Sequence, residues 1–263
     1  MSTSRDPSTI DWNKESNIGK RSTDYEMMQI LDKNGTIKRW RKMPQVPFLN
    51  LSAAELAFEK ILLMMYRDIP WYCVPIEKNA KVHRKLIGNT VKLGYLLDEA
   101  KKENYLKTPA TQVIEPLEEA YSVRRFFREG SLGLITTVPK LVFVYLDYMG
   151  TWSEEKLDDF ILMLNSGMLA NRFTYAFTIS SARGNPSTME QLFKLSRGKK
   201  MLDFGRVVGE KKIFEAKTNG LVKLIVKTAQ EQNWEAKPLA FLPYRGFRST
   251  EYKFLFDFRK AAA

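Results

Sequence analysis

The sequence has almost no cysteine or histidine: its 263 residues include one of each, Cys73 and His83. A single cysteine excludes an internal disulfide framework and favours a reducing compartment. With one thiol and one imidazole, we do not expect a zinc site of the usual type. A Ser-His-Asp or Cys-His mechanism would have to use His83, which lies among Lys and Arg residues and is interpreted as part of a solvated helix face.

Long hydrophobic runs are also missing. The most apolar stretch, residues 132–149, is interrupted by Pro139 and Lys140 and contains Asp147, so we expect a buried element of a folded domain rather than a membrane span. The first twenty residues are polar and lack the apolar core of a secretory signal. We therefore expect an intracellular protein, in the cytoplasm or the nucleus.

What the sequence does have is positive charge, with a formal net charge of +12 that is unevenly distributed. Residues 1–44 carry +3, residues 45–172 carry none, and residues 173–263 carry +9. The middle of the chain is balanced like an ordinary soluble domain, and the excess lies at the two ends. This asymmetry favours a polyanionic partner, either nucleic acid or an anionic membrane surface.

The residue pattern predicts an α+β fold in which the N-terminal two-thirds is mainly helical and the C-terminal third is basic and contains strands. Ser52 and Glu55 form a capping box ahead of an apolar run, and apolar residues at helical spacing follow Ser153. Alternating aromatic residues in 173–179 predict a strand. We expect a flexible basic arm in 1–44, a helical domain in 45–172 and a basic α+β region in 173–263, which could be continuous with the helical domain.

Residues 199–258 carry the strongest chemical signal. Two short apolar segments, 202–208 and 213–216, flank a Gly-Glu-Lys-Lys turn and are interpreted as a strand hairpin. An apolar stretch at helical spacing follows in 221–232, and 251–258 alternates as a second aromatic strand. Both a binding surface and an enzyme site can be built from this region.

The binding interpretation pairs cations with phosphates and stacks bases on exposed rings. A second basic segment, with four cations around one tryptophan, lies near the N-terminus. The residues assigned to nucleic-acid binding are Lys38, Arg39, Trp40, Arg41, Lys42, Lys199, Lys200, Arg206, Lys211, Lys212, Lys223, Lys227, Tyr244, Arg245 and Arg248.

The enzyme interpretation rests on Asp203, Glu215 and Lys217, whose order resembles that of the metal-dependent PD-(D/E)xK nucleases. Such a nuclease needs two carboxylates to hold a divalent cation and a lysine to orient the attacking water. On a strand, Glu215 and Lys217 point to the same face. The resemblance covers about thirty residues and departs from the pattern, because the proline before the aspartate is missing.

A third interpretation is a peripheral membrane matrix or scaffold protein, in which the same cations meet acidic headgroups. Neither an N-terminal myristoylation glycine nor a C-terminal prenylation cysteine is present.

From these features we predict a non-enzymatic, self-associating protein that binds single-stranded nucleic acid, RNA rather than DNA, as viral nucleocapsid or matrix proteins do. The virion is then a further location. We expect no cofactor and no resident metal. The metal-dependent nuclease and the peripheral membrane scaffold are the alternatives.

Overall fold

The computed structural model describes residues 18–51, 56–102, 113–148, 150–182, 184–204, 211–245 and 250–262. The chain divides into two compact units, unit 1 (Met1–Arg125) and unit 2 (Phe126–Ala263), whereas the sequence suggested a boundary after residue 172. Helix α5 (Val123–Ser131) spans the change from one unit to the other. Each unit is described by itself.

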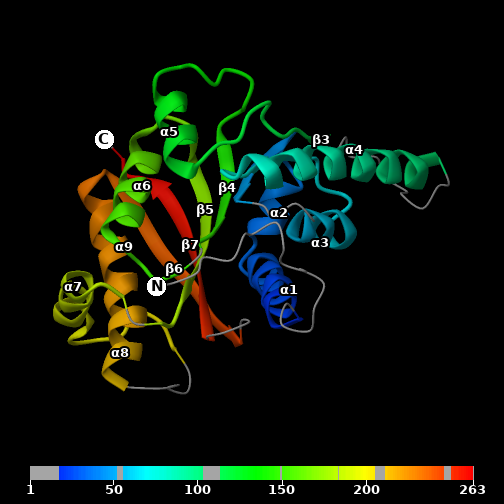
Figure 1. The fold of residues 1–263 in the computed structure, drawn as a ribbon. Coiled ribbons are helices and arrows are strands. Elements are labelled where there is room, and N and C mark those ends of the chain that lie inside the picture. Colours follow the sequence, from blue (N-terminus) through cyan, green and yellow to red (C-terminus); the bar gives the residue numbers. More distant parts are fainter. Residues whose placement is uncertain are drawn as a thin grey trace. The chain divides into compact units, whose positions relative to one another are not determined.

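Unit 1 alternates strands and helices (Figure 1). Its strands form a parallel set in the order β3-β2-β1, with β1 residues Val46 to Leu51 paired in register with β2 residues Trp71 to Ile76. One helix connects β1 to β2 and another connects β2 to β3, which makes a βαβαβ unit. Its elements are α1 (Ile18–Lys33), α2 (Thr36–Trp40), β1 (Val46–Leu51), α3 (Ala57–Met65), β2 (Trp71–Ile76), α4 (Ala80–Lys102) and β3 (Val113–Ile114).

The predicted fold class, with a mainly helical N-terminal two-thirds, is therefore wrong: the fold alternates strands and helices from β1 to β5. The two apolar runs VPFLNL and WYCVPI are strands buried on both faces, so they lack the period-two alternation that identifies a half-exposed strand. The helix predicted after Ser52 begins only at Ala57, and the capping box itself lies outside the described residues.

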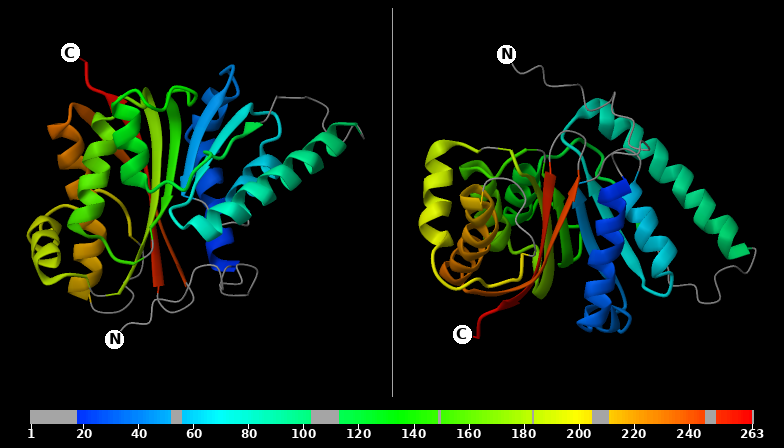
Figure 2. Two further views of the ribbon diagram at one scale, coloured as in Figure 1. Left: turned by 45° about the horizontal axis from the view of Figure 1, so that its top comes forward. Right: turned by 90° about the horizontal axis from the view of Figure 1, so that it is seen from below.

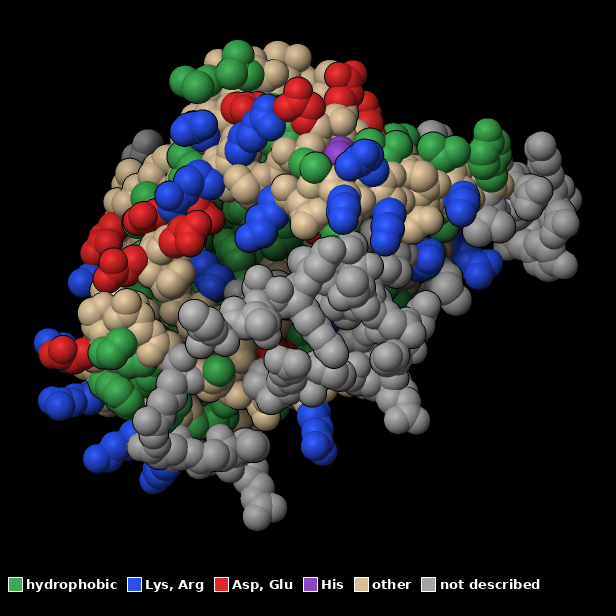
Figure 3. Space-filling view, viewed as in Figure 1, with side chains coloured by type: hydrophobic (Ala, Val, Ile, Leu, Met, Phe, Trp, Pro, Cys, Tyr) green, Lys and Arg blue, Asp and Glu red, His purple; other side chains and the backbone are tan. Residues whose placement is uncertain are grey.

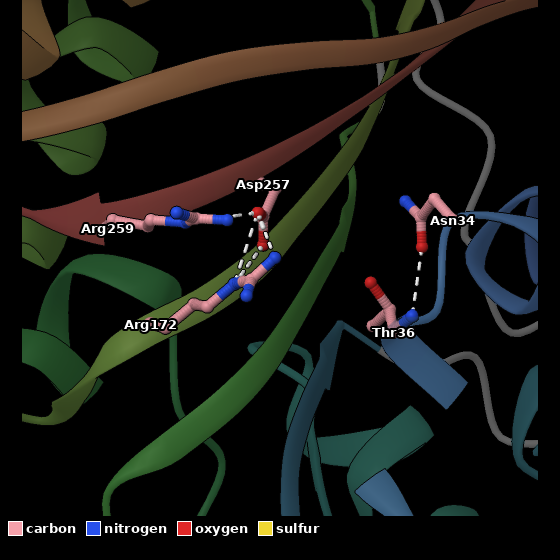
Figure 4. A network of polar contacts seen from close by, with 5 residues as sticks. All are labelled: Asn34, Thr36, Arg172, Asp257 and Arg259. Carbon is pink, nitrogen blue, oxygen red and sulfur yellow. Dashed lines mark hydrogen bonds and ion pairs between the residues drawn. The ribbon is translucent and has the colours of Figure 1, made fainter. Parts of the chain in front are cut away.

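The segment predicted to be a flexible arm is partly helical. Helix α1 begins at Ile18, and Met27, Met28 and Leu31 on it are fully buried. In the turn between α1 and α2 the Asn34 side-chain oxygen accepts a hydrogen bond from the Thr36 amide at 3.0 Å (Figure 4). Residues 1–17 lie outside the described part of the chain, so a role of the arm in self-association stays a prediction.

Unit 2 contains a mixed sheet in the order β4-β5-β7-β6. Strand β5 is parallel to β4 and antiparallel to β7, and β6 is antiparallel to β7. The two views in Figure 2 show helices beside this sheet. The elements are β4 (Leu141–Asp147), α6 (Glu154–Asn165), β5 (Leu169–Ser180), α7 (Pro186–Ser196), α8 (Lys211–Glu215), the π-helix η3 (Ala216–Gly220), α9 (Leu221–Glu231), β6 (Trp234–Arg245) and β7 (Thr250–Lys260).

Several elements of unit 2 agree with the sequence pattern. The strands predicted at 173–179 and 251–258 lie within β5 and β7, and the helix after Ser153 is α6, whose first turn is capped by the Ser153 hydroxyl. Aromatic rings hold β5 and β7 together; Phe177 stacks on Phe254 at 5.1 Å. Strand β5 is buried on both faces from Phe173 onward, because aromatic and Thr side chains are all enclosed.

An ion pair ties β5 to β7 (Figure 4). The Arg172 guanidinium donates to both carboxylate oxygens of Asp257, at 2.7 Å from Nη2 to Oδ2 and 3.1 Å from Nε to Oδ1. The Arg259 Nε lies 3.8 Å from the same carboxylate. The Asp257 side chain is only 6% exposed, so its charge depends on these two cations.

The hairpin predicted at 202–216 is wrong. Residues 211–231 run as one helical segment through α8, η3 and α9, and residues 205–210 lie outside the described part. Gly220 explains the close packing of this segment on α7: a β-carbon there would lie 2.3 Å from the Leu192 carbonyl oxygen. Short apolar runs do not distinguish a buried helix from a strand, and tertiary packing decided this one.

Candidate functional site

A polar cluster lies at the carboxyl end of β2 in unit 1. Glu77 follows the last residue of the strand directly, and its Oε1 accepts a hydrogen bond from the Asn79 amide at 2.7 Å. The side-chain oxygen of Asn79 in turn caps α4 by accepting from the Lys81 and Val82 amides. Partial burial raises the pKa of the half-buried Glu77 carboxyl above its ordinary value, against the lowering effects of the Asn79 amide and of Lys78.

The only histidine of the chain belongs to the same cluster. His83 is 4% exposed, and its Nε2 lies 3.4 Å from the Glu118 carbonyl oxygen. Within the described residues its Nδ1 has no hydrogen-bond partner. The prediction that His83 lies on a solvated face is therefore wrong: it is on the inner face of α4, while its neighbours Arg84 and Lys85 are exposed.

A second acidic group lies at the end of β3. The Tyr72 hydroxyl, from β2, donates a hydrogen bond to Oε2 of Glu115, and burial together with this carboxylate raises the pKa of the Tyr72 phenol. The Glu115 amide bonds the Cys73 carbonyl at 2.9 Å, which continues the β2–β3 pairing by one residue. Cys73 itself is fully buried, and burial raises the pKa of its thiol well above the ordinary value, so it is no ready nucleophile.

A carboxyl group also lies at the end of β1. The Asn50 amide donates to Oε1 of Glu59 at 2.8 Å, and Glu59 is fully buried in the first turn of α3. Between β1 and α3 the sequence contains no glycine. A dinucleotide-binding turn places glycines here so that a pyrophosphate can approach the helix N-terminus. An acid and no glycine at this point disfavour a pyrophosphate ligand.

The basic residues predicted near the N-terminus are separated by the structure. Trp40 is fully buried and packs edge-on against Trp71 at 5.5 Å, so its ring offers no face for a base to stack on. Arg41 pairs with Asp68, at 2.5 Å, and Arg39 is half-buried. Lys38 and Lys42 are exposed.

The basic residues predicted in the C-terminal third are spread over unit 2. Lys199, Lys200, Lys211 and Lys212 are exposed around the ends of α7 and α8, and Arg245 is exposed at the end of β6. The remaining described members of the set have partners. Lys223 donates a hydrogen bond to the Arg197 carbonyl, Lys227 lies 3.8 Å from Glu231, and the ring of Tyr244 is covered by the ammonium group of Lys253. Arg206 and Arg248 lie outside the described residues. The assignment of this set to nucleic acid stays a prediction.

The nuclease alternative is wrong in its geometry. Glu215 ends α8 and Lys217 lies in η3, so the two are not alternate residues of a strand. Lys217 is 2% exposed and its Nζ donates to the Ser180 carbonyl at 3.3 Å, whereas Asp203 is exposed. In the described part of the chain no group of three or more His, Cys, Asp or Glu residues could hold a metal ion.

The electrostatics of Lys217 are perturbed by its burial. Burial lowers its pKa from 10.5 to about 8, and the Glu251 carboxylate opposes this effect. It lies in a π-helical turn, a local irregularity that is often found at functional positions.

None of the helices in the described residues is both long and apolar enough to cross a membrane.

No protein family matches the chain, and the search of curated proteins finds no match. Among solved structures, the chain is similar to M. jannaschii TYW2 in complex with AdoMet, at 14% identity and a TM-score of 0.40, over 96% of this chain and 80% of that one. The chain is also similar to NSun6 from Pyrococcus horikoshii with SFG, at 12% identity and a TM-score of 0.43, over 97% of this chain and 56% of that one. The similarity to LepI in complex with SAM has 10% identity and a TM-score of 0.42, over 88% of this chain and 47% of that one.

The chain spans about half the length of NSun6 and of LepI. All three TM-scores lie below 0.5, so the roles of residues in this chain rest on its own geometry.

The prediction of a non-enzymatic nucleocapsid, matrix or scaffold protein is accordingly wrong. It was made together with a mainly helical fold, and unit 1 is instead a parallel βαβαβ unit with polar groups at the carboxyl ends of its strands. Parallel strands of this kind bind ligands at that edge.

Sequence reasoning missed Glu77 and Glu59. The available signal for Glu77 was an acid directly after the apolar run Trp71–Ile76, which marks the end of a buried strand. That signal has meaning only if the run is a parallel strand, and the run was not assigned as one.

Proposed function

We propose that the chain is an enzyme of the group-transfer class whose unit 1 binds a nucleoside cofactor without a pyrophosphate, such as S-adenosylmethionine. The observation that carries the proposal is the half-buried carboxylate of Glu77 directly after β2 in a parallel βαβαβ unit. In mononucleotide-binding folds an acidic residue at this place accepts hydrogen bonds from the ribose hydroxyls.

The neighbours of Glu77 fit this role. The Asn79 amide holds one carboxylate oxygen at 2.7 Å, which fixes the orientation of the group, and the capped start of α4 fixes Asn79. The buried His83 packs on the inner face of α4, in the first turns of the helix that follows Glu77. A ribose hydroxyl would therefore meet a positioned acceptor rather than a mobile one.

The end of β1 favours a cationic or neutral ligand over an anionic one. Glu59 in the first turn of α3 puts a carboxyl group where a phosphate is bound in dinucleotide sites, and no glycine allows the backbone to be approached there. Two acids in one ligand-binding half suit a sulfonium cation, and S-adenosylmethionine combines that cation with an adenosyl ribose. When bound, it supplies an electrophilic methyl group for transfer to a nucleophilic atom of a substrate.

Thermal-shift measurements with a ligand panel test the proposal. S-adenosylmethionine and S-adenosylhomocysteine should raise the melting temperature by mass action on the folded state, and NAD should not. Glu77→Ala should abolish the shift while leaving the unliganded melting temperature nearly unchanged, because the side chain is half-exposed.

Glu118→Gln is the control, since Glu118 is an exposed acid of the same unit, in the segment between β3 and α5. Its ligand-induced shift should equal that of the unmodified protein. Stabilisation by NAD alone, or an unchanged shift in Glu77→Ala, would contradict the proposal.

A further inference from the structure

Helix α4 carries a row of cations on its exposed face. The stripe on this face, called the α4 stripe, consists of Lys81, Arg84, Gly88, Lys92 and Tyr95, at intervals of three or four residues, and of Lys85, which follows Arg84 directly. All six are exposed, and residues 80–95 contain no Asp or Glu. Figure 3 shows Lys and Arg side chains gathered along this helix, which extends past the strands of its own unit in Figures 1 and 2.

The placement of these cations opposes the stability of the helix. The first turn of α4 contains no acid and includes Lys81, although the helix dipole favours negative charge at this end. Among the described residues, Lys81, Arg84 and Lys92 make no ion pair that would compensate. Local rules are broken in this way where a function requires it.

Two further residues of the stripe lack a structural explanation. Gly88 lies in the middle of the helix, where glycine is unfavourable, and a β-carbon built there meets nothing within 4 Å. Packing therefore does not require a glycine, whereas close approach of an external chain would benefit from one. Tyr95 is 69% exposed and the adjoining Val91 is 53% exposed.

We infer that the α4 stripe binds the backbone of single-stranded nucleic acid. The cations from Lys81 to Lys92 extend over about 16 Å at 1.5 Å per residue. A single strand of nucleic acid that lies along α4 would place phosphates against the cations from Lys81 to Lys92. It would approach the helix most closely at Gly88, and one of its bases would stack on the ring of Tyr95. An anionic membrane is disfavoured because the apolar side chains of α4, Val82, Leu86 and Leu93, are buried in the protein. The inference does not depend on the proposed cofactor.

Fluorescence anisotropy of a labelled oligouridylate against salt concentration tests the inference. In the triple variant Lys81→Ala/Arg84→Ala/Lys92→Ala, affinity at low salt should fall about tenfold or more, and the slope of log affinity against log salt should decrease by about 2. The control Lys199→Ala/Lys200→Ala/Lys211→Ala removes three exposed cations from unit 2 and should leave the slope unchanged.

Two single variants keep the test independent of the charge change and of any effect on folding. Tyr95→Ala should weaken binding about tenfold by loss of stacking, and Gly88→Gln should weaken it by obstructing the approach of the strand. Three results would overturn the inference. The salt slope could decrease equally in both triple variants, or it could decrease in the control variant alone. The protein could also bind phosphatidylserine vesicles without binding the oligonucleotide. The S-adenosylmethionine thermal shift, measured in the same variants, should be unaffected.

Discussion

Replacing the buried Lys217 should change how the stability of the protein depends on pH. Burial lowers the pKa of this lysine from 10.5 to about 8, with Glu251 acting in the opposite direction. Between these two pH values the unfolded chain binds a proton that the folded protein does not, so the free energy of unfolding rises with pH across this window. Below pH 8 the lysine is charged in both states, and the full cost of burying the charge is present.

The size of the effect follows from the pKa change. A fall from 10.5 to about 8 corresponds to about 3 kcal/mol at neutral pH. Lys217→Met removes this cost but also loses the hydrogen bond to the Ser180 carbonyl, which is worth about 1 kcal/mol. The variant should therefore be more stable than the unmodified protein by about 2 kcal/mol at pH 7, and the advantage should disappear as pH approaches 10.

Urea unfolding at several pH values from 7 to 10 measures this difference. The tyrosines, whose ordinary pKa is 10.0, begin to ionise at the top of this range in every variant alike, so each variant is compared with the unmodified protein at the same pH. The exposed Lys212 on the preceding helix provides the control, because Lys212→Met should give a curve parallel to that of the unmodified protein. A constant difference between Lys217→Met and the unmodified protein at all pH values would refute the reasoning.

Three other predictions follow from the same structure. Gly88→Ala should raise the free energy of unfolding by about 1 kcal/mol in urea titration, because alanine is the better helix former and its β-carbon meets open space; destabilisation would show that Gly88 is packed. Arg172→Ala should cost more stability than Asp257→Asn in the same assay, because it removes the cation that contacts both oxygens of a 6%-exposed carboxylate, whereas Arg172 is itself 37% exposed and can be hydrated; the reverse order would contradict this. Cofactor affinity should fall on acidification at a pH above 4.5, the ordinary pKa of a glutamate, because the pKa of Glu77 is raised and its protonation removes a hydrogen-bond acceptor. Isothermal titration calorimetry of Glu77→Gln should show no such pH dependence.

The elements that the sequence predicted correctly are those whose apolar or aromatic residues recur at a regular period. Apolar residues at helical spacing identified α6 and α9, and alternating aromatic residues identified β5 and β7. Strands β1 and β2 were missed because they are buried on both faces and show no alternation. The run at 213–216 was assigned to a strand although its surroundings make it helical.

The candidate site could be predicted less well than the fold. The sequence search looked for clusters of cations and for close pairs of carboxylates. Glu77 and Glu59 act through their places at the ends of β2 and β1, so they become a pair only when those runs are recognised as parallel strands. Trp40 shows the opposite error, because a ring flanked by four cations proved to be a core residue packed on Trp71.

The central claim, that Glu77 holds a cofactor ribose, is tested most directly by a double-mutant cycle in isothermal titration calorimetry. S-adenosylhomocysteine and its 2′,3′-dideoxy analogue are each titrated into the unmodified protein and into Glu77→Ala. Removing the hydroxyls should cost the unmodified protein about tenfold or more in affinity, and should cost Glu77→Ala almost nothing. An equal loss of affinity in both proteins would place the ribose elsewhere and contradict the account.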